Sequence, residues 1–344
     1  MYRKQFLPTL TALSLCVTFF LSGCTSFNIE KNITKVQPNQ NVAASENSMM
    51  HHLQTFEEIA EQNGGNRAVG TAGGLASAQY ILEQAKKAGL HAQMLPFENR
   101  EKTVGQNIVI EIEGQSKDTA VIVGAHYDSV KMGPGINDNA SGVAVLLALL
   151  QDYAKQKVKP KHTLYLAFWD SEEVGIAGSQ AFVKSLSEKQ LQGIQAYINV
   201  DMVGTKNPNI MIADGDHSSI AEMAAQFKAN GLAQSDYQPI LDSMSQLPKH
   251  PQDAALEERM RQYFKTNNIQ IKDDVTTLTA SDTLPFLGKV PVTSLILFNE
   301  QMKGDELEFA PCYHKACDTI DGVDVNSLNL ALNVIQHLLS DLNK

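Results

Sequence analysis

Apolar residues follow two patterns along this chain, and the two patterns alternate. Continuous apolar runs are typical of buried strands, and a strict alternation of apolar and polar residues is typical of a half-buried strand. These patterns predict strands at 107–113, 121–125, 163–169, 197–200, 209–213 and 291–298. Apolar residues spaced three or four apart predict helices at 45–62, 73–87, 143–153, 174–186, 220–227, 254–264 and 325–342. Strands alternating with helices predict a three-layer α/β fold, in which a mostly parallel central sheet carries helices on both faces.

The first residues of the chain have the pattern of a targeting signal. Arg3 and Lys4 precede a mostly apolar run from Phe6 to Leu21. This run is shorter than the roughly 20 residues that a helix needs to span a bilayer. It ends in Leu21-Ser22-Gly23-Cys24, which resembles the cleavage box of a bacterial lipoprotein.

We therefore expect residues 1–23 to be a signal peptide and Cys24 to carry lipid. An ordinary secretory signal that is cut nearby is the alternative. Thr25, where an aspartate would favour retention, resembles outer-membrane sorting in a Gram-negative cell. We therefore expect export and a lipid anchor in a bacterial membrane, on its periplasmic or cell-surface side. Residues 24–44 are polar and aperiodic, which predicts a flexible tether.

Residues 45–344 show no break in composition and no internal repeat, so we expect a single domain. The stretch 236–252 contains three prolines and predicts a loop, and 236–270 is a candidate lid insertion. The chain is acidic, with a formal net charge of −10 and a pI of about 5.4. This charge argues against a nucleic-acid partner. We expect a monomer.

Good metal-binding side chains lie at or after the ends of the expected strands and in one late motif. They are His126, Asp138, Glu173, Asp201 and His314. In open α/β sheets, ligands bind beyond the carboxyl ends of the strands. Imidazole and carboxylate donors together suit Zn²⁺ or a similar first-row ion. A catalytic zinc ion uses three protein ligands, so five ligands suit two Zn²⁺ per chain if one carboxylate bridges them.

Two further acidic residues lie beside these ligands. Glu172 precedes Glu173 on a tight turn, where one side chain can bind metal while the other faces a water, so Glu172 is a candidate general base. Alternatively, the pair caps a helix N-terminus, where the dipole favours carboxylates. Asp128 lies two residues after His126 on the same face of the extended chain, and it can accept a hydrogen bond from the imidazole. A turn-forming aspartate is the alternative reading of Asp128.

Five motifs occur in order along the chain: HYDS (126–129), GINDNASG (135–142), DSEEVGIAGS (170–179), NVDMVG (199–204) and CYHKACDTID (312–321). Their order and ligand types resemble the di-zinc exopeptidases of the bacterial leucyl aminopeptidase and aminopeptidase Y group. That group is related to glutamate carboxypeptidase and glutaminyl cyclase. Together with an entry segment at 53–70, the resemblance covers nearly all of residues 50–340.

The resemblance implies a metal-binding role for each matching ligand. Asp138 would bridge two zinc ions. His126 and Asp201 would complete one site, and Glu173 and His314 would complete the other.

The resemblance also implies roles around the metals. Glu172 would be the general base, and Asp128 would orient His126. Tyr313 would polarise the scissile carbonyl or stabilise the tetrahedral intermediate; a packed aromatic residue is the alternative. The Asp138–Asn139 peptide bond would be cis, as it often is in these enzymes.

Cys312 and Cys317 flank Tyr313 and His314. An exported protein meets an oxidising environment, so we expect these two cysteines to form a disulfide that holds their neighbours in place. Thiolate ligation of zinc is the alternative.

Some residues depart from the family pattern or lie outside its motifs. Thr283 occupies a position where the family often has an aromatic residue or a histidine, in a segment that helps to wall the substrate pocket. Four histidines outside the motifs are expected at the surface: His51, His52, His162 and His217.

The resemblance therefore implies a metal-dependent aminopeptidase that acts on peptides with a free N-terminus and a large apolar first residue. A hydroxide that bridges the metals would attack the first carbonyl, and Glu172 would carry the proton. Three alternatives remain open. They are a glutaminyl cyclase with one zinc, a carboxypeptidase on the same scaffold, and a lipoprotein that binds peptides without cleaving them.

Overall fold

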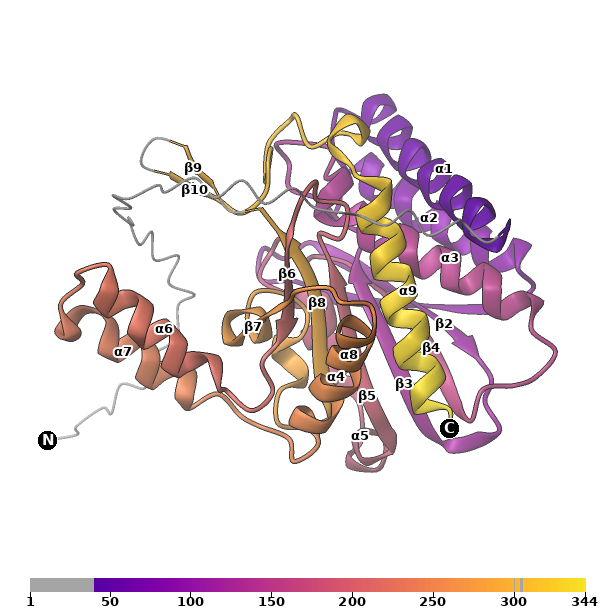
Figure 1. Ribbon diagram of the computed structural model, residues 1–344. Coiled ribbons are helices and arrows are strands. Elements are labelled where there is room, and N and C mark those ends of the chain that lie inside the picture. Colours follow the sequence, from indigo (N-terminus) through magenta and orange to yellow (C-terminus); the bar gives the residue numbers. More distant parts are fainter. Residues whose placement is uncertain (1–39, 300, 304–305) are drawn as a thin grey trace, which may run out of the picture.

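The computed structural model describes residues 40–299, 301–303 and 306–344, with the backbone alone at 40–47, 301–303 and 306–308. The expected signal peptide, the lipidation site Cys24 and the expected tether up to residue 39 lie outside the described residues. The described chain forms a twisted sheet with helices on both faces (Figure 1). The three-layer α/β prediction is therefore confirmed.

The main sheet has eight strands in the order β1-β2-β4-β3-β5-β8-β6-β7. Their bounds are β1 (His91–Glu98), β2 (Val104–Ile112), β3 (Ser116–His126), β4 (His162–Trp169), β5 (Ile194–Asp201), β6 (Asn209–Ala213), β7 (Lys272–Asp274) and β8 (Val292–Phe298). A separate hairpin pairs β9 (Gln301–Lys303) with β10 (Glu306–Glu308). The four central strands β4, β3, β5 and β8 are parallel to one another, so their carboxyl ends meet along one edge of the sheet.

Helices cover both faces of this sheet. Their bounds are α1 (Gln40–Gln62), α2 (Ala72–Lys87), α3 (Ser141–Lys155), α4 (Ala177–Ser185), α5 (Glu188–Gly193), α6 (Ser219–Ala229), α7 (Gln234–Ser245), α8 (Asp253–Thr266) and α9 (Val325–Leu342). Buried residues of α1, α2, α3, α8 and α9 share one core with the sheet, and those of α4 share the other. Within the described part of the chain, no helix combines the length and the apolar composition that crossing a membrane requires.

Helix α3 lies at the centre of the larger core. Its residues from Ser141 to Leu150 are all buried, because α1 and α9 cover the side of the helix that faces away from the sheet. The smaller core is built around Trp169, with Tyr197 and Phe286 stacked at 3.7 Å between ring centroids. The sheet is thus fixed from both sides, and its carboxyl edge is a rigid base for side chains.

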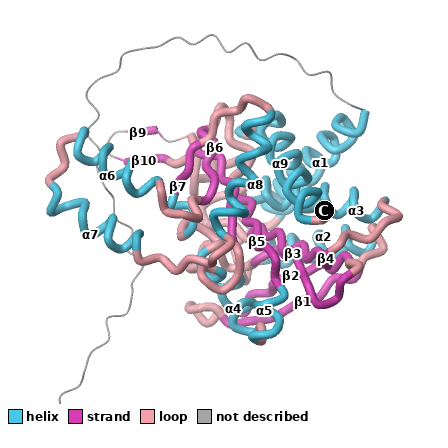
Figure 2. The backbone as a smooth tube through the Cα atoms, turned by 60° about the horizontal axis from the view of Figure 1, so that its bottom comes forward, coloured by secondary structure: helices cyan, strands magenta, loops and turns pink. Residues whose placement is uncertain are grey.

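Most predicted elements are confirmed, and the following features differ; the short strands β7, β9 and β10 were also not predicted. The expected loop at 236–252 contains α7, because Tyr237 and Leu241 pack against Phe227 of α6 although Pro239 interrupts the helix hydrogen bonds. Both Figure 1 and Figure 2 show α6 and α7 as a hairpin beyond the β7 edge of the sheet. Helix α1 begins at Gln40, so residues 40–44 of the expected tether are helical. Strand β1 and helix α5 carry no clear apolar signal and were not predicted.

A fully buried arginine holds the loop that follows β3. The Arg67 guanidinium donates hydrogen bonds to the carbonyls of Pro134 at 2.8 Å, Gly135 at 2.6 Å and Tyr127. Its backbone N–H donates to Ser129 Oγ at 2.9 Å. Burial lowers the pKa of Arg67 to about 10, although nearby carboxylates oppose this change. A single side chain therefore fixes both ends of the 127–135 loop.

The same loop region is held from the other side by residues near the C-terminus. The Asp318 carboxylate accepts the backbone N–H groups of Asn137 at 2.8 Å and Asp138 at 3.1 Å. Gly133 packs so closely that an added Cβ would lie 2.2 Å from the Lys315 carbonyl oxygen. Two loops that are far apart in sequence therefore pack backbone against backbone.

We predict that Arg67→Met lowers the free energy of unfolding by about 3–5 kcal/mol, because it leaves buried carbonyls without donors. Urea unfolding followed by the fluorescence of Trp169 measures this change. The matched control is Arg100→Met, since Arg100 is exposed; we expect it to change stability by less than about 0.5 kcal/mol. Equal stability of the two variants would contradict the role given to Arg67.

Candidate metal centre

The candidate ligands converge at the carboxyl edge of three adjacent parallel strands. His126 ends β3 and lies level with Trp169, the last residue of β4. The register between β3 and β5 pairs Gly124 with Asn199, two residues before His126 and Asp201 respectively. The sheet therefore places His126 beside Asp201, and the turn after β4 brings Glu172 and Glu173 to the same edge.

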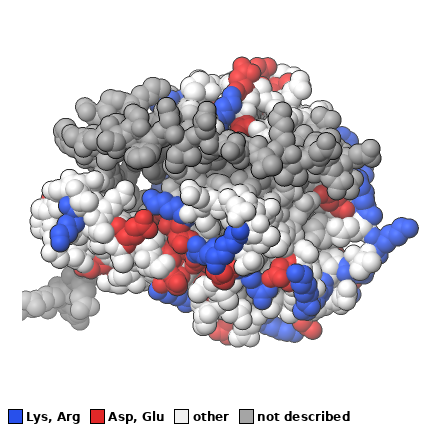
Figure 3. All heavy atoms as spheres, in the orientation of Figure 1, with Lys and Arg blue, Asp and Glu red and all other residues white. Residues whose placement is uncertain are grey.

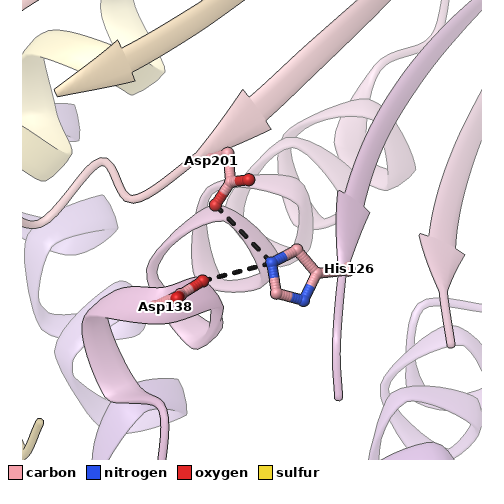
Figure 4. A group of neighbouring side chains, drawn as sticks. All are labelled: His126, Asp138 and Asp201. Atoms are coloured by element: carbon pink, nitrogen blue, oxygen red, sulfur yellow. Dashed lines mark ion pairs between the residues drawn. The ribbon is translucent and has the colours of Figure 1, made fainter. Parts of the chain in front are cut away.

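His126, Asp138 and Asp201 form one cluster (Figure 4). His126 Nε2 lies 3.2 Å from Asp138 Oδ1 and 3.6 Å from Asp201 Oδ1. The side chain of His126 is only 1% exposed, so this cluster is sealed from solvent on the histidine side.

Asp138, Glu173 and His314 form a second cluster. His314 Nε2 lies 3.2 Å from Asp138 Oδ2 and 3.1 Å from Glu173 Oε2. The side chain of His314 is 39% exposed, so this cluster lies at the mouth of the site. Asp138 belongs to both clusters, and each of its two oxygens faces a different histidine. All five candidate ligands are thus together.

The segment that carries Asp138 is tied directly to the strand that carries Asp201. Asn139 Nδ2 donates to the carbonyl of Val200 at 2.9 Å, and Asn139 Oδ1 accepts the N–H of Met202 at 3.1 Å. Val200 and Met202 flank Asp201 in the sequence. The Asp138–Asn139 peptide bond is cis, as expected. Hydrogen bonds from one asparagine therefore set the distance between Asp138 and Asp201.

The loop that carries His314 is closed by a disulfide. Cys312 and Cys317 are bonded, with their Cα atoms 5.3 Å apart. Between them, the ring of Tyr313 stacks on the imidazole of His314 at 3.8 Å between centroids. Burial, with the nearby Asp138 and further carboxylates, raises the pKa of Tyr313 well above its ordinary value, so its hydroxyl keeps its proton. The disulfide bond was predicted from the sequence and is present.

Asp128 links the end of β3 to the turn that follows β4. Its carboxylate accepts the N–H of Glu172 at 3.1 Å and that of Glu173 at 3.4 Å. His126 Nδ1 lies 3.4 Å from Asp128 Oδ1 and hydrogen-bonds to the Asp128 carbonyl at 3.2 Å. Asp128 is fully buried. It therefore fixes the orientation of His126 and the position of the Glu172–Glu173 turn at the same time.

The site concentrates carboxylates, and their negative charge stabilises positively charged groups beside them. Burial lowers the pKa of His314, but Asp138 and Glu173 outweigh this and raise it to about 10. Burial also lowers the pKa of His126, and the surrounding aspartates raise it well above its usual value. Burial, together with repulsion from Asp138, raises the pKa of Glu173 to about 7. A divalent cation would supply the positive charge that these carboxylates require and would displace the imidazole protons.

The donor atoms fit metal ions in a further respect. Glu173 Oε1 and Asp201 Oδ1 are buried oxygens without a hydrogen-bond partner. Unpaired buried oxygens are costly unless a cation or a donor satisfies them. The two clusters offer imidazole nitrogen and carboxylate oxygen, which is the donor set of catalytic zinc. The residues therefore fit a pair of zinc ions or similar cations.

Glu172 follows β4 beside these clusters and is half-buried. Burial raises its pKa well above the ordinary value; His126 opposes this change, and Asp282, Glu173 and Asp201 add to it. Asp282 is itself fully buried, and its Oδ1 accepts a hydrogen bond from Ser179 at 2.5 Å.

Thr283 is fully buried, and the next residue, Leu284, is 40% exposed. One expectation about the histidines needs correction. His52 and His217 are buried rather than at the surface. His52 Nδ1 lies 2.6 Å from the Tyr80 hydroxyl, so the imidazole links α1 to α2.

A third acidic group, Asp214, Asp216 and Glu257, lies away from these clusters. Asp214 Oδ2 accepts the N–H of Ser219 at 2.8 Å, and Glu257 Oε2 accepts the N–H of Gly215 at 2.8 Å. Main-chain donors at the start of α6 therefore satisfy these carboxylates, and the group stabilises that loop.

Sequence reasoning missed Arg67 and Asp318, which position the segment carrying Asp138. Arginine and aspartate are most often exposed. Their role depends on backbone groups that lie far away in the sequence, so no local pattern identifies it.

Comparison with known proteins agrees with this geometry. Residues 107–339, more than half of the chain, match peptidase family M28. An aminopeptidase of Pseudomonas aeruginosa is 28% identical over 254 residues, which are 71% of this chain and 42% of that protein. The probable lipoprotein aminopeptidase LpqL of Mycobacterium tuberculosis is 32% identical over 239 residues, 65% of this chain and 43% of that protein. The chain thus spans less than half the length of these relatives.

Solved structures share the fold. An aminopeptidase from Aneurinibacillus sp. strain AM-1 superposes with a TM-score of 0.64 at 15% identity, covering 88% of this chain and 95% of that one. A glutaminyl cyclase of Porphyromonas gingivalis gives 0.63 at 18% identity, covering 86% and 98%. The fold is therefore common to both kinds of protein. With its ligand clusters and its family match taken together, the chain belongs to peptidase family M28.

Proposed function

We propose that this chain is an exported, lipid-anchored aminopeptidase that uses two zinc ions to remove a large apolar N-terminal residue from peptides. The observation that carries this proposal is the shared carboxylate, because each oxygen of Asp138 faces a different histidine. A pair of cations bridged by one carboxylate is a known hydrolytic device.

The five ligands divide naturally between two ions. His126 and Asp201 would hold one ion, Glu173 and His314 would hold the other, and Asp138 would contact both. When bound, the ions supply Lewis acidity, which makes a water more acidic and polarises the scissile carbonyl.

The neighbouring residues would move protons and orient groups. Glu172 takes a proton from the attacking water and delivers it to the leaving amine, since its carboxylate lies beside the ligands without belonging to either cluster. Asp128 holds His126 and the Glu172–Glu173 turn in place. Tyr313, whose hydroxyl stays protonated, donates a hydrogen bond to the developing oxyanion.

The surroundings favour a free N-terminus with an apolar side chain. A substrate ammonium group is attracted to a centre with a surplus of carboxylates. An apolar cluster of Met202, Ile296 and Phe298 packs with Tyr313 next to the centre. A large apolar first residue would bury surface against Phe309 and Tyr313, which lie at the edge of this cluster and are partly exposed.

The lipid anchor rests on the leader pattern and on the sequence Leu21-Ser22-Gly23-Cys24. The similarity to LpqL, a relative whose name describes a lipoprotein, supports the same assignment. Attachment of lipid to Cys24 would place the peptidase domain on a bacterial membrane surface, the outer membrane if the cell is Gram-negative.

A glutaminyl cyclase is the second candidate, because the P. gingivalis enzyme shares the fold about as closely as the aminopeptidase does. Both histidine clusters are complete in this chain, which favours two metals and therefore peptide hydrolysis. A carboxypeptidase would need a cation for the substrate carboxylate, and the guanidinium of Arg67, near the centre, is occupied by backbone carbonyls.

We expect the purified protein to hydrolyse leucyl-4-nitroanilide at least about 100-fold faster than its N-acetylated form, because acetylation removes the ammonium group that the site attracts. A chelator should abolish the activity, and added zinc should restore it. Release of nitroaniline measures both effects. Equal rates on the two substrates would contradict an aminopeptidase, and cyclisation of N-terminal glutamine without peptide hydrolysis would identify a cyclase instead.

We predict that Glu172→Ala lowers kcat by about 10²–10⁴-fold, because general acid–base catalysis is lost. Metal content, measured by mass spectrometry of the elements, should stay unchanged. The matched control is Glu188→Ala on α5, since Glu188 is exposed and belongs to neither cluster. If kcat of the Glu172 variant equals that of the control, Glu172 is not the base.

We predict that Asp138→Ala loses most of its zinc after dialysis, because both clusters lose a ligand. Asp216→Ala, in the acidic group near α6, should retain the zinc content of the unaltered protein. Two zinc ions per chain in the Asp138 variant would refute the bridging role.

A further inference from the structure

The end of the molecule opposite the metal centre carries a dense run of lysines. Lys155, Lys157, Lys159 and Lys161 account for four of the 28 basic residues and lie within seven positions, from the last residue of α3 through the loop that leads to β4. All four are exposed, and Val158 between them is 74% exposed. We call residues 155–161 the lysine loop. Basic side chains line the right-hand rim of Figure 3, on the side where α3 ends in Figure 1.

Neighbouring carboxylates neutralise only part of this charge. Glu113 pairs with Lys159 at 2.6 Å and with Lys117 at 3.5 Å, so one carboxylate serves two lysines. Asp152 is half-buried, accepts a hydrogen bond from Gln336 at 2.8 Å and attracts the charge of Lys155. A surplus of positive charge therefore remains, although the chain as a whole has a net charge of −10.

A groove of about 820 Å³ opens beside the lysine loop, between the end of α3 and α9. Lys155, Lys159 and Lys161 line it together with the Asp152 carboxylate and the amide side chains of Gln336 and Asn343. Ammonium and amide N–H groups are donors that suit the oxygens of a phosphate ester. Because three ammonium groups face one carboxylate, the groove favours an anionic headgroup.

The chain enters the domain at this same end. Helices α1 and α3 run in opposite directions, and Ser48 Oγ of α1 donates to Gln151 Oε1 near the end of α3 at 2.8 Å. Gln40, the first residue of α1, precedes Ser48 by eight residues, which is about 12 Å further along the helix. The metal centre lies at the opposite end of α3, about 22 Å away for its 15 residues.

Fifteen residues separate Cys24 from Gln40, and even a fully extended segment of this length spans no more than about 58 Å. A lipid on Cys24 would therefore keep the lysine loop within reach of the membrane surface. One lipid-linked signal combined with a polybasic patch is a common way to stabilise membrane attachment.

We propose that the lysine loop and its groove form the face by which the domain lies against anionic phospholipid headgroups of the anchoring membrane. This inference rests on the proposed lipid anchor. Lysines near an anionic surface each add to binding, and salt screens that attraction. Val158 would lie at the interface, and the metal centre would face away from the membrane, open to incoming peptides.

The test uses the polypeptide from Thr25 to Lys344 without lipid, which contains the whole described domain. Sedimentation with vesicles of phosphatidylcholine containing about 30% phosphatidylglycerol measures binding, and we expect it to weaken at high salt. The variant Lys155→Gln, Lys157→Gln and Lys161→Gln should bind about 100-fold more weakly. Lys159 is kept because of its pair with Glu113.

The matched control removes the same charge elsewhere, through Lys184→Gln, Lys228→Gln and Lys289→Gln, all at exposed positions. It should bind the vesicles like the unaltered chain. Equal binding by the two triple variants, or equal binding to neutral vesicles, would overturn the proposal. Hydrolysis of leucyl-4-nitroanilide by the same samples tests the peptidase function separately. The mass of the exported protein shows independently whether Cys24 carries lipid.

Discussion

The two oxygens of Asp138 organise this molecule. They lie between His126 and His314, at 3.2 Å from an imidazole nitrogen on each side, and a carboxylate in that position can serve two cations at once. Much of the surrounding structure fixes this one side chain. Arg67 holds the loop before Asp138, and Asp318 accepts its backbone N–H. The next residue, Asn139, is hydrogen-bonded to β5.

The fold and the ligand set could be read from the sequence because both follow short-range rules. A continuous apolar run marks β3, and parallel neighbours place all their carboxyl ends at one edge, so a residue such as His126 or Asp201 at a strand end is placed by the sheet itself. The disulfide was predicted from two cysteines five positions apart in a chain that we expect to be exported.

The features that could not be read depend on contacts between distant segments. Strand β1 lies at the edge of the sheet with alternate residues exposed and contains Pro96, so it lacks the apolar run of a buried strand. Helix α7 contains Pro239, and the packing of its Tyr237 and Leu241 against Phe227 of α6 offsets the lost hydrogen bond. The role of Arg67 could not be predicted for the same reason, since its partners lie 60 or more residues further along the chain.

The two ligand clusters of the metal centre differ in how far their histidines are exposed to solvent. His126 is 1% exposed behind Asp138, whereas His314 is 39% exposed on a loop at the surface. If the centre holds two cations as proposed, the one at His314 would be the more accessible on its histidine side, so a chelator would remove it more easily than the one at His126.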